Sequence, residues 1–155
     1  MPKTAYEEDV RDAVIALLQD ITTANGYNYT VASIEKEWIV FARMADSDLP
    51  GLFVTNEAED ADLEKANTDD VNCKFDQDIS IVIVGGLRGE DAEQWTSIAN
   101  YLIRDVKRAI RKDLTLGGLV DEGVSWTVRR PEPWAARLKN AQFQIVVTYR
   151  GRVTY

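Results

Sequence analysis

The stretch ISIVIVGGLRGEDAEQWTSIANYLIRDVKRAI, residues 79–110, decides the fold of this chain. Its first part places isoleucines on one face and valines on the other, which is typical of a strand buried on both sides in the middle of a sheet. Its second part carries apolar residues at helical spacing from Trp95 to Ile110, which predicts a long amphipathic helix. We therefore expect a sheet with at least one face covered by helices.

Similar patterns continue on both sides of this stretch. Apolar residues spaced three and four apart from Val10 to Ile21 predict a first amphipathic helix that ends near Gly26. β-branched and aromatic residues predict further strands, at residues 29–34, 38–44, 52–55, 125–130 and 143–149. The order helix, strands, helix, strands predicts a single α+β domain over residues 1–155, with two main helices packed on a mostly antiparallel sheet.

The sequence KDLTLGGLVD, residues 112–121, predicts how the second helix ends. Gly117 and Gly118 supply the positive φ angles that other residues resist. Leu119 and Val120 can then fold back on the last helical turn, as in a Schellman-type cap. We interpret this stretch as a structural device that redirects the chain towards the next strand.

Composition excludes several classes of function. A formal net charge of −8 argues against a general nucleic-acid binder, which needs a surplus of Lys and Arg. The absence of histidine removes the commonest general base and most zinc sites. The single cysteine, Cys73, forms no internal disulfide and is interpreted as a small buried residue. No signal peptide or membrane span is predicted, so we expect synthesis in a reducing cytoplasm.

The glycines at residues 85–89 stand between a strand and a helix, where a phosphate-binding loop would lie. The first glycine of the G-x-G-x-x-G pattern is replaced by Val84, and Glu90, Asp91 and Glu93 would repel a phosphate. Asp91, with Gln94 three residues later, instead predicts a helix N-cap. We expect no nucleotide at this position.

Residues 57–70 form an acidic tract that has two interpretations. Carboxylates at alternate positions can converge on a hard cation, so the tract could belong to a metal-dependent enzyme or ligand-binding module. It lacks the glycine turn and the spaced glutamate of an EF-hand loop, however, and a solvated loop is the simpler interpretation. We predict no metal ligand, cofactor or catalytic residue here.

Taken together, these features resemble the tail terminator proteins of long-tailed bacteriophages. The resemblance covers nearly the whole chain. It rests on the first helix, the LPGLFV entry at residues 49–54, the acidic tract, the isoleucine-rich strand, the helix that ends in DLTLGG at residues 113–118, and the closing strand followed by VTY at residues 153–155. The loop at residues 131–137 matches no feature of that family.

The resemblance implies a structural virion protein without catalytic activity. Proteins of that family form rings, generally hexameric, that cap the tail tube, end its polymerisation and join the tail to the head. The implied partners are other copies of the chain, the tail tube protein, a head-tail connector or neck protein and, in a contractile tail, the sheath protein. The implied location is the tail or neck of the virion, after assembly in the host cytoplasm. The alternative is the small carboxylate- or metal-dependent module described above.

Three sets of residues are predicted to act in such a ring. Arg104, Arg108 and Arg111, at the basic end of the second helix, are expected to face acidic groups of a neighbouring subunit, the alternative being a solvated helix face. Trp134, in the loop PEPWAAR, is expected to anchor an interface, the alternative being that it covers the sheet edge. The third set is acidic and is expected to line a lumen through which DNA passes without specific binding. The alternative is that these residues face the tail tube or a neighbouring subunit. The set consists of Glu57, Glu59, Asp60, Asp62, Glu64, Asp69 and Asp70.

Overall fold

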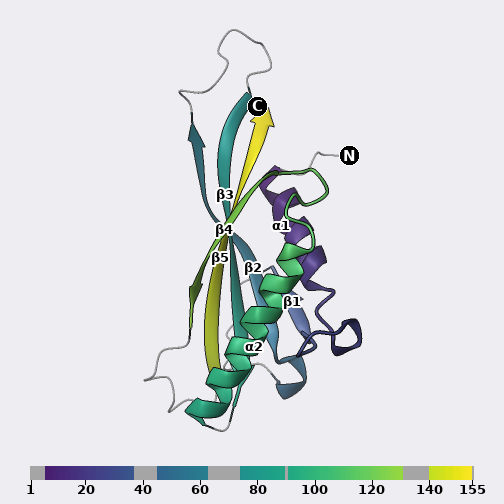
Figure 1. Ribbon diagram of the computed structural model, residues 1–155. Helices are drawn as coiled ribbons and strands as arrows, with labels where there is room; N and C mark the ends of the chain where they lie inside the picture. The colour runs from purple at the N-terminus through teal and green to yellow at the C-terminus, as the bar shows by residue number, and fades with distance from the viewer. Residues whose placement is uncertain (1–5, 37–44, 63–73, 90, 131–139, 155) are drawn as a thin grey trace.

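Two helices pack against one face of a five-stranded sheet in the computed structural model (Figure 1). The structure describes residues 6–36, 45–62, 74–89, 91–130 and 140–154. The predicted α+β class and the order helix, strands, helix, strands are confirmed. The predicted strand at residues 38–44 lies outside the described residues. The helices are α1 Tyr6–Leu18 and α2 Ala92–Arg111, with short 3-10 turns at η1 Thr23–Asn25 and η3 Asp46–Asp48.

The sheet has the strand order β1-β2-β3-β5-β4, with the isoleucine-rich strand in the middle as predicted. β1 runs parallel to β2, and the other pairs are antiparallel. The strands are β1 Ser33–Glu35, β2 Gly51–Asp62, β3 Lys74–Arg88, β4 Asp121–Arg129 and β5 Asn140–Thr154. The two longest strands pair along their full length, from Lys74↔Thr154 to Arg88↔Asn140. The upper ends of β2, β3 and β5 extend beyond both helices (Figure 1).

Two sequence-based expectations about strands are wrong. Residues 57–62 were expected to form a solvated loop, but they continue β2 in antiparallel pairing with β3 after a register shift between Asn56 and Ala58. The backbone hydrogen bonds of the long central strand support this acidic segment despite its low β-propensity. Of the strand predicted at residues 29–34, only Ser33 and Ile34 pair with the sheet, as part of β1.

The predicted N-cap of α2 is confirmed, whereas its C-terminus differs from the expected cap. The Asp91 carboxylate accepts a hydrogen bond from the Gln94 backbone N–H at 2.8 Å. At the other end, α2 stops at Arg111, before the glycines. Gly117 and Gly118 have the expected positive φ angles of 70° and 89°, but they belong to a separate turn. The Asp113 carboxylate organises that turn by accepting the Gly117 N–H at 2.8 Å.

The main core lies between the sheet and the two helices. Both helices contribute apolar residues that are fully buried, because their apolar stripes face the isoleucine side of β3. Burial in this core raises the pKa of the Tyr149 phenol well above its ordinary value. The opposite face of the sheet carries a smaller buried cluster, formed by Phe53, Val82 and Val84. The principal members of the main core are Val10, Val14, Leu18, Ile79, Ile81, Ile83, Trp95, Leu102, Val106, Ile145 and Val147.

Candidate subunit interface

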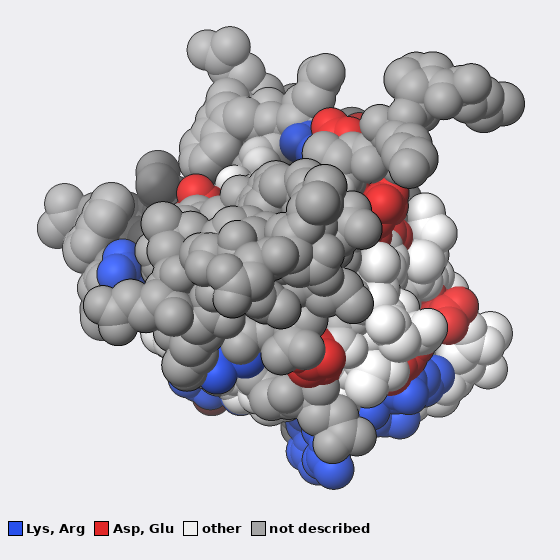
Figure 2. Space-filling model, turned by 90° about the horizontal axis from the view of Figure 1, so that it is seen from above, with Lys and Arg blue, Asp and Glu red and all other residues white. Residues whose placement is uncertain are grey.

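The last turns of α2 form an exposed cationic surface. Arg104, Arg108 and Arg111 are exposed, and Lys107 is half-buried beside them. The single acidic residue in these turns, Asp105, is fully buried, so the exposed charged side chains of these turns are all cationic. Viewed from above, Lys and Arg residues gather at one margin of the molecule (Figure 2). Positive charge at a helix C-terminus is favoured by the helix dipole, so this surface is stable without a partner.

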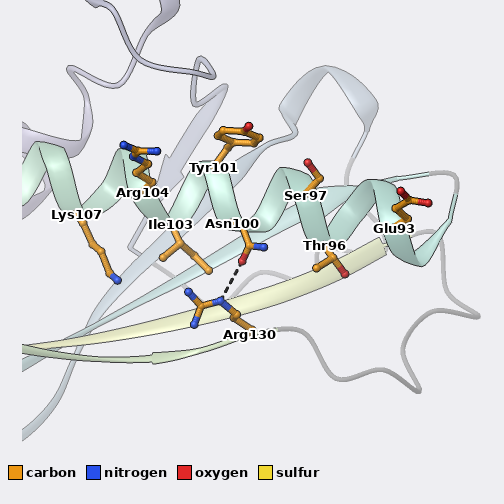
Figure 3. A pocket seen from close by; sticks show the side chains of 9 residues that line it. All are labelled: Glu93, Thr96, Ser97, Asn100, Tyr101, Ile103, Arg104, Lys107 and Arg130. Carbon is orange, nitrogen blue, oxygen red and sulfur yellow. Dashed lines mark hydrogen bonds between the residues drawn. The ribbon is translucent and has the colours of Figure 1, made fainter.

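A groove of about 870 Å³ runs between α2 and the end of the edge strand β4. Arg130, immediately after β4, reaches across it, and its Nε donates to Asn100 Oδ1 at 3.0 Å (Figure 3). Lys107 points to the same side of the helix, with its ammonium 5.6 Å from the centre of the Trp126 ring. Such a cation–π contact holds the lysine against the strand while leaving its charge available. The groove is lined by Glu93, Thr96, Ser97, Asn100, Tyr101, Ile103, Arg104, Lys107 and Arg130.

The groove combines positive charge with exposed aromatic surface. Three cationic side chains line it, against one acidic side chain at the start of the helix, Glu93. Tyr101, which is 47% exposed, adds aromatic surface to the groove. Tyrosine and arginine are enriched at protein interfaces, where a large ring and a planar cation supply much of the binding energy. This composition suits an acidic protein partner.

The three arginines predicted to face a neighbour have different surroundings. Arg104 lines the groove. Arg108 donates to the backbone oxygen of Gly26 at 3.1 Å, and its guanidinium lies 4.8 Å from the centre of the Tyr27 ring. It therefore also holds the turn after α1 in place. Arg111 is exposed. The assignment of these residues to a subunit interface stays a prediction.

The predicted acidic residues are described only in part. Glu57 is exposed at the register shift of β2. Glu59, Asp60 and Asp62 occupy the next positions of the same strand. Glu64, Asp69 and Asp70 lie outside the described residues, as do Cys73 and Trp134. The lumen and the tryptophan anchor remain predictions.

The acidic segment and the cationic groove lie far apart within one chain. β2 and β4 are separated in the sheet by β3 and β5. Three strand spacings of about 4.8 Å put them roughly 14 Å apart. The acidic segment is also at the upper end of the sheet, whereas α2, which supplies most of the groove's lining, runs along its lower half (Figure 1). The structure therefore does not bring the two predicted charge sets together within one chain.

The sequence analysis did not identify two of the cationic residues that line the groove. Lys107 and Arg130 were not among the residues predicted to act in the ring. The signal that was available is the spacing Asn100, Arg104, Lys107, which places three polar side chains along one side of a helix. The pairing of that side with β4 depends on the strand order, which the sequence does not encode locally.

Other kinds of site were sought among the described residues. Within these ranges, no group of three or more His, Cys, Asp or Glu side chains is placed to hold a metal ion. Among the helices that the structure describes, none is long and apolar enough to cross a membrane.

Comparison with known proteins yields a structural similarity only. No protein-family model matches the chain, and no curated protein sequence matches it. Among solved structures, the chain is similar to a chain of the virion of a native gene transfer agent particle. The two are 14% identical over 97% of this chain and 100% of that chain, with a TM-score of 0.42.

Proposed function

We propose that this chain is a structural protein of a phage-like virion that assembles into a homohexameric ring. The ring caps the tail tube, ends its polymerisation and joins the tail to the head connector. The observation that carries this proposal is the separation of charge between two edges of one sheet, with a cationic groove beside β4 and an acidic segment on β2. Two different complementary patches on one molecule favour head-to-tail association, which closes into a ring when the rotation allows.

The proposed partners follow from this role. They are other copies of the chain, the tail tube protein, and a connector or neck protein, with a sheath protein where the tail contracts. The role requires no catalysis and no cofactor. The competing class, a carboxylate-dependent module, would instead act as a monomer that binds a divalent cation. The cation would then raise the melting temperature, because a ligand that binds only the folded state stabilises it.

A tube-assembly experiment tests the proposed role. Purified chain added to polymerising tail tube protein is expected to shorten the tubes and to appear at one end of each tube in electron micrographs. An unchanged distribution of tube lengths at saturating chain would contradict the capping role. Bovine serum albumin at the same concentration serves as the control for non-specific effects on polymerisation.

We propose further that the acidic tract from Glu57 to Asp70 lies at the lumen of the ring, where Glu64, Asp69 and Asp70 face the DNA beyond the part of the tract that meets the neighbouring subunit. Fixed carboxylates repel phosphates, so DNA would pass without adhering to the wall. The expected result is that the unmodified protein does not retard double-stranded DNA in a gel even at about 10 mM salt, where the screening length is about 30 Å. Retardation of DNA under these conditions would remove the lumen assignment. A variant with Glu64→Gln, Asp69→Asn and Asp70→Asn, which leaves residues 57–62 unchanged, should assemble as the unmodified chain does and bind DNA more readily.

A further inference from the structure

We propose that the groove between α2 and β4 receives the acidic segment of β2, residues 57–62, from a second copy of this chain. This inference rests on the proposed ring and identifies the two surfaces that form its subunit contact. The groove supplies positive charge and a sheet edge, and the acidic segment supplies negative charge and another sheet edge.

The first argument is charge. Arg104, Lys107 and Arg130 line the groove, so an acidic segment would find three cations along one surface. Residues 51–62 of β2 contain four carboxylates and no Lys or Arg. Opposite potentials across an interface speed association, fix the register of the partners and reject wrong partners. The acidic composition of this segment therefore matches the positive charge of the groove.

The second argument is the state of the two strand edges. Among the described residues, no strand pairs with the outer edge of β4, and none pairs with the outer edge of β2 beyond Phe53. Open edges present N–H and C=O groups that another strand can satisfy. The edge of β4 lies beside the cations of the groove, and the edge of β2 carries the acidic residues, so pairing would bring backbone groups and opposite charges together.

The third argument is that one chain cannot satisfy this match by itself. β3 and β5 stand between β2 and β4, and these two central strands are paired over fifteen positions. The acidic segment therefore has no route to the groove of its own chain. A second copy can offer it, and its own groove then remains open for a third copy. This is the head-to-tail arrangement from which rings close.

Charge reversal followed by restoration tests this contact in the full-length chain. Changing Lys107→Glu together with Arg130→Glu should raise the concentration for half-maximal assembly at least about tenfold, since the groove would then repel the acidic segment. Adding Glu57→Lys and Asp60→Lys to the same chain should restore assembly, because both partners are then reversed. Light scattering gives the mass of each variant, and circular dichroism checks that each one folds. Lys36→Glu, which reverses an exposed charge outside the groove, is the matched control and should assemble normally.

Each other outcome has a definite meaning. If the groove variant assembles as the unmodified chain does, the proposed contact is wrong while the ring itself stands. The same conclusion follows if the variant with all four substitutions does not regain assembly. If the ring mass is unchanged and only binding to the tail tube is lost, the groove faces the tube and a second copy is not its occupant. If the unmodified chain is monomeric at every concentration, both the ring and the proposed contact between two copies are wrong.

Discussion

Replacing Asp105 with Ala is expected to lower the free energy of unfolding by about 3 kcal/mol. The Asp105 carboxylate is fully buried and accepts three hydrogen bonds from the segment that follows α1. Asn28 donates its backbone N–H and its Nδ2 to Oδ1 at 3.2 and 2.8 Å, and the Tyr29 N–H donates to Oδ2 at 3.0 Å. Removal of the carboxylate would leave these three part-buried donors without their acceptor, and the loss of a charged acceptor costs free energy.

Thermal unfolding at a fixed protein concentration measures this effect. For a chain of this size, about 3 kcal/mol corresponds to a decrease in melting temperature of roughly 6–12 °C. Asp105→Asn should have a smaller effect, because one side-chain oxygen remains as an acceptor. The matched control is Asp20→Ala, at an exposed position, which should stay within about 0.5 kcal/mol. Equal stability of the Asp105→Ala and Asp20→Ala variants would show that the three bonds do not support the fold.

Gly85→Ala is expected to destabilise the fold by a similar amount, about 3 kcal/mol. A Cβ atom at this position would lie 2.0 Å from Cζ of Phe143, whose ring covers the glycine. Phe143 is 1% exposed, so its ring has no solvent to move into. Gly85 and Phe143 also face each other on two paired central strands, which prevents the backbone from separating. The ring or the strand must shift, and overpacking of this kind costs free energy.

A second variant separates this clash from a general effect of alanine in the strand. With Phe143→Leu in the background, the ring is absent, and Gly85→Ala should then cost at least about 1 kcal/mol less than it does alone. Denaturant unfolding of the four chains in this cycle gives the coupling free energy. If the two substitutions are additive, the contact between the ring and Gly85 is not the reason that glycine stands there.

The sequence predicted the elements that depend on local patterns. The alternation in residues 79–84 indicated the central strand, and the spacing from Trp95 to Ile110 indicated α2, because burial of one face demands that periodicity. Asp91 was identified as a cap because its hydrogen bond spans only three residues. Features of this kind are encoded within a single element.

The features that the sequence did not reveal depend on distant contacts. Residues 57–62 are acidic, yet they form part of β2 because β3 pairs with them across a sheet. Gly85 and Gly86 lie within β3, and Phe143 occupies the space over Gly85 from another strand. Asp105 was not singled out from the sequence, because the residues that donate to it, Asn28 and Tyr29, lie more than 70 positions away. In each of these cases the local structure depends on contacts between residues that are distant in the sequence, and no local sequence pattern indicates such contacts.

The candidate site likewise has one part that the sequence predicted and one part that it did not. The cationic end of α2 was predicted, since it follows from the composition of one helix. The groove was not, because Arg130 reaches Asn100 only when β4 lies beside α2. The separation of the groove from the acidic segment follows from the strand order, which places β2 and β4 on different sides of the central pair. The case for association between chains rests on this separation.

The mass of the purified chain in solution tests the central claim most directly. Size-exclusion chromatography with multi-angle light scattering, at about 150 mM salt and over a range of protein concentrations, reports the mass without reference to a partner. The ring predicts a stable species near six times the chain mass of 17.5 kDa. A monomer at every concentration, with a melting temperature that rises on addition of Mg²⁺ or Ca²⁺, would contradict the ring and favour the metal-dependent module.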